Sequence, residues 1–385
     1  MEHNNSQFKP IASIRVIGIG GAGNNAVNRM IEAEVQGVDF YVANTDAQVV
    51  NASPAENKII LGKELSKGLG AGANPEIGKQ AAIESEAEIK RALDGADMVF
   101  IAAGMGGGTG TGAASIVARI AKECGALTIA IVTKPFKFEG RNRNAHAVVG
   151  IENLKKQVDA IIIISNDKLL QVIGNIPLKD SFKEADNILR QGVQTITDLI
   201  AVPALINLDF ADVRTIIENK GNALFGIGMS KGEHKAKQAA TKAISSPLLD
   251  DVTIKGAKNA IVNVTGGTTM TLTDANIAVD LVRDAAGNDV NIIFGVAVNE
   301  NLNDEMIVTV IATGFEEEGA NANNFAYSSK VDNHEFITNK TQYLSEEIKE
   351  QTKKKEEEQQ NLVQEAAMEA DDDLPSFLRR RKGVY

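Results

Sequence analysis

The chain has 385 residues, of which 43% are hydrophobic and 4% aromatic, and it contains no tryptophan. This length predicts two or three domains, and the composition predicts that their cores are aliphatic. The formal net charge of −11 argues against an open nucleic-acid-binding surface, because such surfaces are basic.

Three features bear on the compartment in which the protein works. The single cysteine, Cys124, excludes an intramolecular disulfide and indicates reducing surroundings. Residues 1–10 are polar and lack the hydrophobic region of a signal peptide, and no apolar run reaches the length of a membrane span. We therefore expect a cytosolic protein whose contact with any membrane is indirect.

A glycine-rich turn separates an expected strand, residues 11–19, from an expected helix, residues 26–33. The turn consists of Gly20, Gly21, Ala22, Gly23, Asn24 and Asn25. Counted from Gly18 it fits Gly-x-Gly-x-x-Gly, and Asp46 follows the next expected strand, 39–43, where a dinucleotide-binding fold places its ribose-binding acid. The pattern is weak by itself, but it keeps an NAD-dependent enzyme as an alternative.

Polar residues end this second strand, and a second glycine-rich loop follows. Asn44, Thr45 and Asp46 suit a sugar, a phosphate or a metal-bound water, and an ordinary Asx turn explains them equally well. The candidates in the loop are Ala71, Gly72, Ala73 and Asn74. Asn74 followed by Pro75 predicts a helix start, because asparagine caps helices and proline suits the first helical position.

A third glycine-rich loop lies between an expected strand, 97–103, and an expected helix, 113–122. Its candidate phosphate-binding residues are Gly104, Gly106, Gly107, Gly108, Thr109 and Gly110. Glycine lets backbone N–H groups approach a phosphate, a helix N-terminus adds partial positive charge, and Thr109 and Thr111 add hydroxyl donors. The loop does not fit the P-loop pattern. Three such loops favour one polyphosphate surrounded by several helix dipoles.

More candidates follow the next expected strand, 127–132: Thr133, Pro135, Glu139 and Arg143. Arg143 could contact a phosphate or a ribose, and Glu139 could accept hydrogen bonds from ribose hydroxyls. Exposed charges on a loop are the simpler alternative. A further strand over 160–164 completes an alternation of strands and helices that predicts a mostly parallel, doubly wound sheet.

Apolar residues at helical spacing between Phe182 and Ile200 predict one long amphipathic helix that ends before Pro203. We count Phe182 among the candidate nucleotide-binding residues. Asp186 and Asn187 lie near the start of this helix. A carboxylate suits the N1–H and the exocyclic amine of guanine, although capping of the helix start explains both residues equally well.

Two acids follow the long helix. Asp209 and Asp212 are three residues apart around an expected helix start, so they share one side of it. They could cap that helix, but none of the glycine-rich loops carries an acid placed to orient a water, as hydrolysis requires. We therefore predict catalytic roles for Asp209 and Asp212.

The pattern changes from Gly221 onward, where four strands and two helices predict a smaller mixed sheet with its own core. Beyond Phe315 the chain becomes polar and densely charged, which predicts disorder or a solvated helix, the latter over 341–370. Three apolar residues then lie between an acidic and a basic block: Leu374, Phe377 and Leu378. The segment from Asp371 to Lys382 therefore predicts a docking peptide that orders on binding.

Together these motifs resemble the FtsZ family of bacterial, tubulin-like cell-division GTPases, most specifically at 107–112 and 207–214. The resemblance covers about 11–315 and 371–385. It implies that the chain binds GTP or GDP together with Mg²⁺ and hydrolyses GTP. It also implies cytoplasmic head-to-tail filaments that form the division ring at mid-cell. In such filaments Asn207, Asp209 and Asp212 of one subunit complete the catalytic site of the next.

The resemblance also assigns binding roles to particular residues. It places residues 20–25 and 107–110 at the phosphates, and residues 71–74 at the γ-phosphate. It places Glu139 and Arg143 at the ribose, and Asn166 and Asp186 at the guanine. It further implies that the segment from Asp371 to Lys382 binds membrane-adaptor and regulatory division proteins. No nucleic acid and no direct membrane insertion are expected.

We thus expect an α/β fold: a tubulin-like, doubly wound parallel-sheet GTPase domain, a long connecting helix, a smaller mixed-sheet α+β domain and a charged tail. The expected parts are a GTP-binding domain (11–176), the connecting helix (177–202), a C-terminal domain that begins with the acid loop (203–315), a charged linker (316–370) and the docking peptide (371–385). An NAD-dependent enzyme would leave the third glycine loop unexplained. A tubulin-like structural protein without catalysis would need both acids to be only caps.

Overall fold

The computed structural model describes residues 12–174, 177–201, 209–245, 253–287 and 289–315. All of the described elements belong to one unit of the chain, Met1–Glu316. Three of the predictions lie outside the described residues: those on Asn207, on the linker 316–370 and on the docking peptide 371–385.

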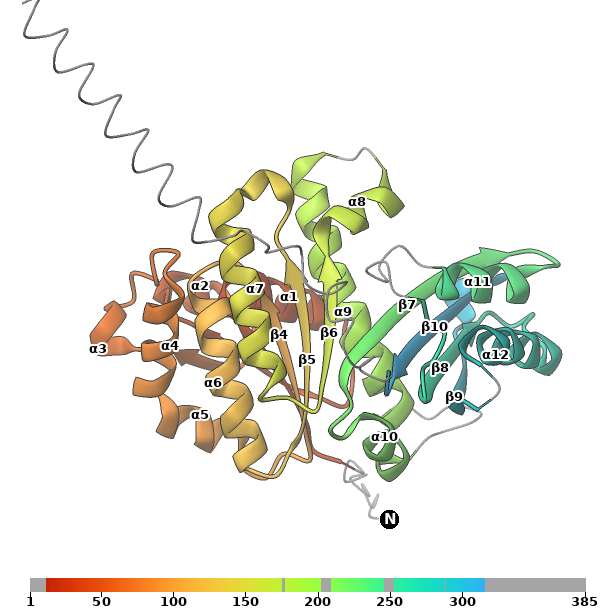
Figure 1. Ribbon diagram of the computed structural model, residues 1–385, viewed down its shortest axis with the longest axis horizontal. Helices are drawn as coiled ribbons and strands as arrows, with labels where there is room; N and C mark the ends of the chain where they lie inside the picture. Colours follow the sequence, from red (N-terminus) through yellow and green to blue (C-terminus); the bar gives the residue numbers. More distant parts are fainter. Residues whose placement is uncertain (1–11, 175–176, 202–208, 246–252, 288, 316–385) are drawn as a thin grey trace, which may run out of the picture. The chain divides into compact units, whose positions relative to one another are not determined.

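One sheet of ten strands runs through the described part of the chain, in the order β3-β2-β1-β4-β5-β6-β7-β10-β8-β9 (Figure 1). The strands from β3 to β7 in this order pair in parallel, whereas β10 is antiparallel to both β7 and β8. The strands are β1 (Ile14–Ile19), β2 (Asp39–Asn44), β3 (Asn57–Ile60), β4 (Met98–Gly104), β5 (Leu127–Lys134), β6 (Ala160–Ser165), β7 (Gly221–Lys231), β8 (Asn259–Gly266), β9 (Asn291–Val298) and β10 (Glu305–Thr313).

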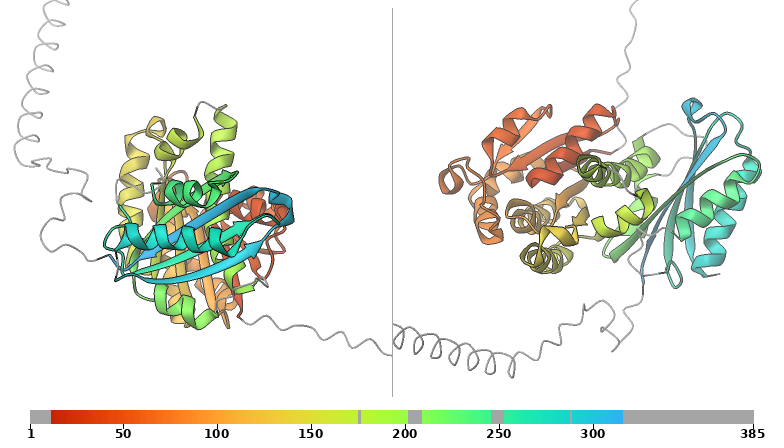
Figure 2. Two further views of the ribbon diagram at one scale, coloured as in Figure 1. Left: turned by 90° about the vertical axis from the view of Figure 1, so that its right-hand side faces the viewer. Right: turned by 90° about the horizontal axis from the view of Figure 1, so that it is seen from above.

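Helices cover both faces of this sheet (Figure 2). The helices are α1 (Gly20–Glu32), α2 (Ala47–Ala52), α3 (Lys63–Ser66), α4 (Pro75–Glu84), α5 (Glu86–Leu93), α6 (Thr109–Glu123), α7 (Arg141–Lys155), α8 (Asn166–Ile173), α9 (Leu178–Ala201), α10 (Phe210–Ile217), α11 (Lys235–Ile244) and α12 (Leu272–Ala286), with 3₁₀ turns η1 (Lys137–Glu139) and η2 (Glu300–Leu302). None of the helices in the described ranges is both long enough and apolar enough to cross a membrane.

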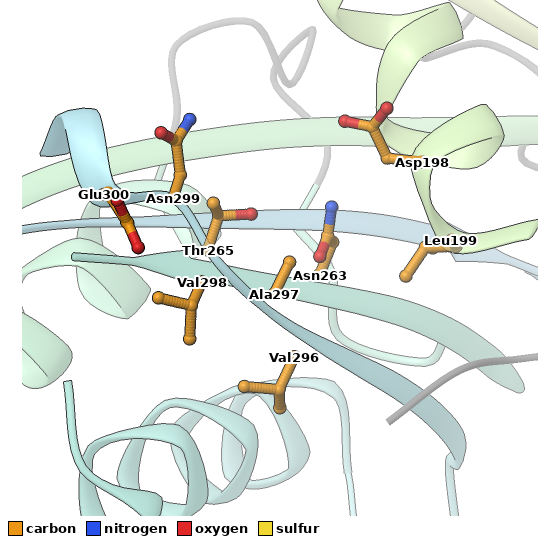
Figure 3. Close-up of a pocket in the computed structure, with 9 residues that line it drawn as sticks. All are labelled: Asp198, Leu199, Asn263, Thr265, Val296, Ala297, Val298, Asn299 and Glu300. Atoms are coloured by element: carbon orange, nitrogen blue, oxygen red, sulfur yellow. The ribbon is translucent and has the colours of Figure 1, made fainter. Parts of the chain in front are cut away.

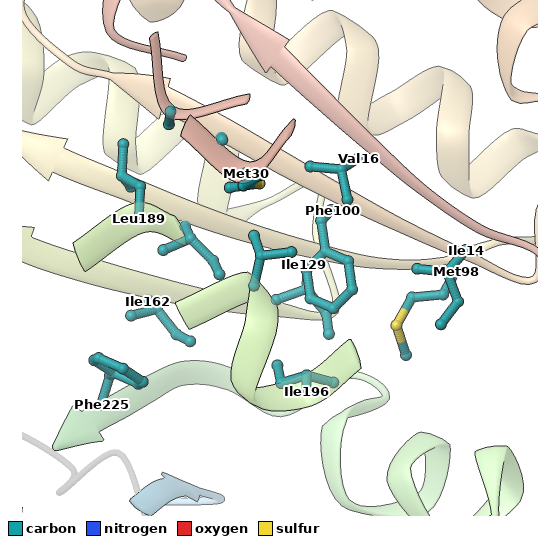
Figure 4. Close-up of a cluster of buried hydrophobic side chains, with 14 of the residues drawn as sticks. Ile14, Val16, Met30, Met98, Phe100, Ile129, Ile162, Leu189, Ile196 and Phe225 are labelled. Carbon is teal, nitrogen blue, oxygen red and sulfur yellow. The ribbon is translucent and has the colours of Figure 1, made fainter. Parts of the chain in front are cut away.

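Successive side chains of the central strands pack alternately into two separate cores. Val16 and Phe100 pack on the face covered by α1, α9 and α10, together with Leu189 and Ile196 of α9 (Figure 4). Their neighbours Ile17 and Ile101 pack on the opposite face, which is covered by α4, α5, α6 and α7. Because both faces are buried, the central strands are apolar over most of their length, as parallel strands between two helical layers are.

A third core lies among α11, α12 and the strands β8, β9 and β10. The predicted architecture of a doubly wound sheet followed by a smaller mixed sheet is therefore confirmed. One feature was not predicted: β7 pairs in parallel with β6 through Gly221, Asn222 and Ala223. The two sheets that we expected are therefore one continuous sheet.

Several expected boundaries were wrong for identifiable reasons. The helices α1 and α6 begin at Gly20 and Thr109, inside the glycine-rich runs, because close packing against neighbouring loops outweighs the low helix propensity of glycine. The strand β3 went unpredicted because it has only four residues and two of them, Asn57 and Lys58, are polar. The long helix α9 has 24 residues, which gives a length of about 36 Å at 1.5 Å per residue.

Candidate functional site

The glycine-rich turns after β1 and β4 meet at the centre of the sheet. From β1 the chain first moves outward to β2 and β3, and then returns to β4 on the other side of β1. Ligands of parallel α/β sheets bind at the carboxyl ends of the strands where the strand order reverses in this way. The two turns are in close contact, since a Cβ atom placed on Gly20 would lie only 2.8 Å from the backbone nitrogen of Gly110.

The helices that start at these two turns have free N-termini. Neither α1, preceded by Ile19, nor α6, preceded by Gly108, has a side-chain cap or an acidic residue in its first turn. By contrast Asp46 caps α2 and Asn74 caps α4. Two adjacent uncapped N-termini concentrate unpaired N–H groups and positive helix-dipole charge at one place, which suits a polyphosphate.

The loop before α4 packs directly onto the loop before α6. A Cβ atom on Gly108 would lie 2.8 Å from the Cβ of Ala71 and 3.0 Å from the backbone nitrogen of Asn74, so only glycine fits there. Added Cβ atoms on Gly21, Gly72 and Gly107 would instead meet no other atom within 4 Å. The structure thus brings the three predicted glycine loops together and leaves open space beside one glycine of each.

Several of the polar residues predicted in these loops have partners within the protein. The hydroxyl groups of Thr109 and Thr45 are 2.7 Å apart and buried, and the Thr111 hydroxyl accepts from the backbone N–H of Gly106 at 2.8 Å. Asn24 is fully buried, and its side-chain amide donates to the carbonyl oxygens of Gly18, Gly20 and Ala43. The side chains of Thr111 and Asn24 therefore hold the loops in shape. Because a hydroxyl that accepts keeps its own O–H donor, the role of Thr111 as a ligand donor stays a prediction.

The end of β2 has the Asx geometry that was left open as an alternative. Asp46 accepts from the backbone N–H groups of Gln48 and Val49 at 2.9 and 3.3 Å, so it caps α2. The buried Asn44 in turn accepts from the backbone N–H of Asp46 at 3.3 Å. With its carboxylate engaged at a helix start, Asp46 is poorly placed to bind a ribose as the acid of a dinucleotide-binding fold does.

Residues at the end of β5 and just after it extend the site along the same edge of the sheet. A Cβ atom on Gly104 would lie 3.6 Å from the Thr133 hydroxyl, and one on Gly106 would lie 3.2 Å from the ring of Pro135. Glu139 forms an ion pair with Arg143 in the first turn of α7, and it accepts from the backbone N–H of Phe136 at 2.9 Å. These candidates are therefore anchored side chains rather than loose charges on a loop.

Aromatic and acceptor groups lie at the far end of this row. The ring of Phe182, which is 42% exposed, contacts that of Phe136 edge-on, with centroids 5.3 Å apart. One helical turn further along α9, Asp186 is buried and pairs with Arg29 at 3.5 Å. Asn166, the first residue of α8, is buried, and its Oδ1 has no hydrogen-bond partner in the described part of the chain. An exposed ring one helical turn from a buried carboxylate, together with a buried acceptor at the start of α8, suits a planar base that carries N–H donors.

Burial governs the protonation of Asp186. Desolvation raises the pKa of its carboxyl group to about 6, although the charge and the hydrogen bond of Arg29 oppose this rise. The carboxylate is therefore ionised at neutral pH but close to its titration range.

The two predicted catalytic acids lie elsewhere. Asp209 caps α10, where it accepts from the backbone N–H of Asp212 at 2.8 Å, and both residues are exposed. The turn after α10 bonds to Asp159, which precedes β6, whereas the glycine loops follow the carboxyl ends of β1 and β4. In Figure 1, α10 accordingly lies at the edge opposite to that of α8, which follows the carboxyl end of β6.

A pocket of about 280 Å³ was not predicted from the sequence. Asp198 and Leu199 of α9 line one side, and residues from β8, β9 and the following turn line the other (Figure 3). Burial raises the pKa of Asp198 to about 6, against a hydrogen bond from Gln194 and the charge of Arg190. No sequence signal marks this pocket, because its residues come from elements distant in the chain.

Two family models match the chain. The model of the Tubulin/FtsZ family GTPase domain matches residues 13–174, and that of the FtsZ family C-terminal domain matches residues 221–316. Among solved structures, a dimer of FtsZ from M. jannaschii is 45% identical, covers 80% of this chain and 89% of its own, and superimposes with a TM-score of 0.77. A point mutant of FtsZ from the same organism gives 45% identity, coverages of 79% and 91%, and a TM-score of 0.76. CetZ2 from Haloferax volcanii, at 20% identity, coverages of 79% and 94% and a TM-score of 0.65, shares the fold.

The raised pKa of Asp186 predicts a pH-dependent stability effect. In the unfolded chain this carboxyl group ionises near 3.8, and in the folded protein near 6, so its ionisation costs stability as the pH rises through that interval. Asp186→Asn, which mimics the protonated form, should therefore raise the free energy of unfolding of the nucleotide-free protein at pH 7.5, by on the order of 2–3 kcal/mol.

Urea unfolding between pH 4 and pH 8 measures this difference, which should shrink as the pH falls below about 6. Asp180→Asn, on the same helix with a 45% exposed side chain, is the control. A destabilised Asp186→Asn protein at pH 7.5 would show that the ion pair with Arg29 outweighs desolvation.

Proposed function

The chain belongs to the tubulin/FtsZ family of GTPases, and on this premise we propose that it polymerises head to tail into filaments of the bacterial division ring. As a member it binds guanine nucleotides and hydrolyses GTP. The proposal places these filaments in the cytoplasm at mid-cell, with each active site shared between two subunits. The observation that carries it is the position of the exposed Asp209 and Asp212, at the edge of the sheet opposite to the glycine loops.

In this proposal the nucleotide lies along the row of groups at the carboxyl edge of the sheet. The phosphates occupy the N-termini of α1 and α6, where they contact residues 20–25, 107–110 and, at the γ-phosphate, 71–74, with Gly104 and Gly106 beside them. The ribose lies against Glu139 and Arg143. Thr133 and Pro135 lie between the phosphates and the ribose. The free Oδ1 of Asn166 supports a place for guanine here, with Asp186 as second acceptor and Phe182 stacked on the ring.

The catalytic step that we propose needs groups from two subunits. A carboxylate of Asp209 or Asp212, presented on the exposed side of α10, accepts a hydrogen bond from the attacking water and orients it toward the γ-phosphorus. The new bond forms between the water oxygen and phosphorus, while the bond to the oxygen shared with the β-phosphate breaks and GDP leaves. The water proton passes through the accepting carboxylate to solvent. Asn207 is proposed to act beside these acids.

Mg²⁺ is proposed to accompany the nucleotide. The described residues contain no cluster of three or more His, Cys, Asp or Glu side chains that could hold a metal ion, so phosphate oxygens supply most of the ligands in this proposal. The bound ion would neutralise phosphate charge.

Two further proposals concern the organisation of the chain. The division into a GTP-binding domain (11–176), a connecting helix (177–202) and a C-terminal domain (203–315) is supported by the separate ranges that the two family models match. We also propose that the segment from Asp371 to Lys382 binds membrane-adaptor and regulatory division proteins, through Leu374, Phe377 and Leu378. The dinucleotide alternative loses its support, because Asp46 caps α2.

Mixing two inactive variants tests the shared site. Gly108→Arg should prevent GTP binding, because even a Cβ at this position meets Ala71 and Asn74. Asp212→Ala should bind GTP but fail to orient the water. Mixed at equal amounts, the two should recover hydrolysis to roughly a quarter of the wild-type rate, since about one junction in four pairs an intact acid loop with an intact nucleotide site. Phosphate release measures the rate, and co-pelleting measures co-assembly. Persistent inactivity in co-assembled mixtures would contradict the proposal.

Removal of 371–385 tests the docking peptide. Because the deleted residues lie outside the nucleotide site and outside α10, GTP hydrolysis and pelleting should stay close to wild type. Recruitment to vesicles that carry a division adaptor should be lost, and substitution of Leu374, Phe377 and Leu378 by serine should have the same effect. Recruitment that survives both changes would show that the adaptor binds elsewhere.

A further inference from the structure

A buried carboxylate that the proposed reaction does not use lies at the edge of the sheet away from the glycine loops. Asp159 precedes β6, and its side chain is only 5% exposed. Its carboxylate accepts from the backbone N–H of Thr128 at 2.9 Å and pairs with the Lys122 ammonium at 3.0 Å. A buried charge is costly unless it is paired and hydrogen-bonded, so these contacts fix Asp159 firmly.

The same residue holds the turn that follows α10. The backbone carbonyl oxygen of Asp159 accepts from the backbone N–H groups of Lys220 and Gly221, each at 2.9 Å. The side-chain carboxylate of Asp159 accepts a longer hydrogen bond, of 3.4 Å, from the backbone N–H of Asn219. Lys122 also donates to the side-chain oxygen of Asn219 at 3.3 Å. Asn219 has a φ of 54°, so the turn reverses the chain sharply and these bonds define its shape.

These contacts connect two helices on opposite faces of the sheet. Lys122 lies in the last turn of α6. The first turn of this helix follows Gly108 in the third glycine-rich loop. The turn that it contacts ends α10, whose first turn carries Asp209 and Asp212. Asp159 lies between them at the sheet edge, so an unbroken set of bonds joins the helix at the nucleotide to the helix with the acids.

Apolar packing alone does not fix the direction of α10. This helix has only eight residues, and it is held to the core by the buried Val213, Ile216 and Ile217 and by the partly buried Phe210 in its first turn. Hydrophobic contacts are non-directional, whereas hydrogen bonds and ion pairs are directional. The directional restraints at the C-terminal end of α10 are the bonds of the following turn to Asp159 and the bond of 2.9 Å that the Thr313 hydroxyl donates to the carbonyl oxygen of Ile216.

We propose that Lys122 and Asp159 are positioning residues which, through the turn after α10, aim Asp209 and Asp212 at the nucleotide of the next subunit. The inference rests on the proposed shared site and adds to it a defined asymmetry. Loss of Lys122 should impair the subunit that supplies the acids and spare the subunit that holds the GTP.

The mixing design separates these two roles in the full-length protein. In the first arm Lys122→Met is added to the Gly108→Arg subunit, which can only donate acids. In the second arm it is added to the Asp212→Ala subunit, which can only hold nucleotide. Relative to the mixture without it, kcat should fall about fivefold in the first arm and by less than about 1.5-fold in the second, with KM for GTP unchanged in both.

Two controls accompany these arms. Lys122→Arg keeps the charge and should restore most of kcat in the first arm. Arg119→Met removes an ion-paired side chain from the same helix, but the partners of Arg119 are Glu86 and Glu123, so neither arm should change.

Each other outcome contradicts the inference in a distinguishable way. An equal fall in both arms would show that Lys122 only stabilises the subunit. No fall in the first arm would show that the turn does not direct the acids. If the mixture of Gly108→Arg and Asp212→Ala, with Lys122 intact, recovers no GTP hydrolysis, the shared site itself is refuted, and the positioning role with it.

Discussion

Parallel pairing of the central strands is the constraint on which the rest of the molecule depends. Because β1, β4, β5 and β6 all run the same way, every turn that follows one of them lies at a single edge of the sheet. The glycine loops, the Glu139–Arg143 pair and Asn166 thus form one continuous row. The same constraint carries the chain along α9 to the other edge, where α10 leaves its acids exposed. A monomer built in this way separates the groups proposed to hold the nucleotide from the groups proposed to hydrolyse it.

Much of the fold was predictable, because it follows from local signals. Apolar runs that alternate with amphipathic helices specify a doubly wound sheet, and Asn74 with Pro75 specifies the start of α4. The strand β3 and the pairing of β6 with β7 were not predictable. The first is too short to show a pattern, and the second depends on a contact between segments about 60 residues apart, over only three residue pairs.

At the candidate site, the sequence predicted which loops lie together more reliably than how their side chains are bonded. Glycine signals backbone approach directly, so the clustering of 20–25, 71–74 and 104–110 was foreseeable. A threonine or asparagine looks the same whether it faces a ligand or its own backbone. Thr111 and Asn24 contact backbone groups, and only the folded geometry reveals that. Asp159 and Lys122 had no signal at all, since each is an ordinary charged residue until the turn after α10 meets them.

If two subunits share each active site, the loop before α4 in one subunit faces α10 of the next. Cysteine cross-linking tests it most directly, in a Cys124→Ser background with cysteines at Leu69, which is 85% exposed, and at the exposed Ala211. Upon oxidation in the presence of GTP, the doubly substituted protein should give a ladder of covalent oligomers. A mixture of the two single variants should give covalent dimers and nothing larger. Filaments that pellet normally yet form only a disulfide within one chain, or none, would contradict it.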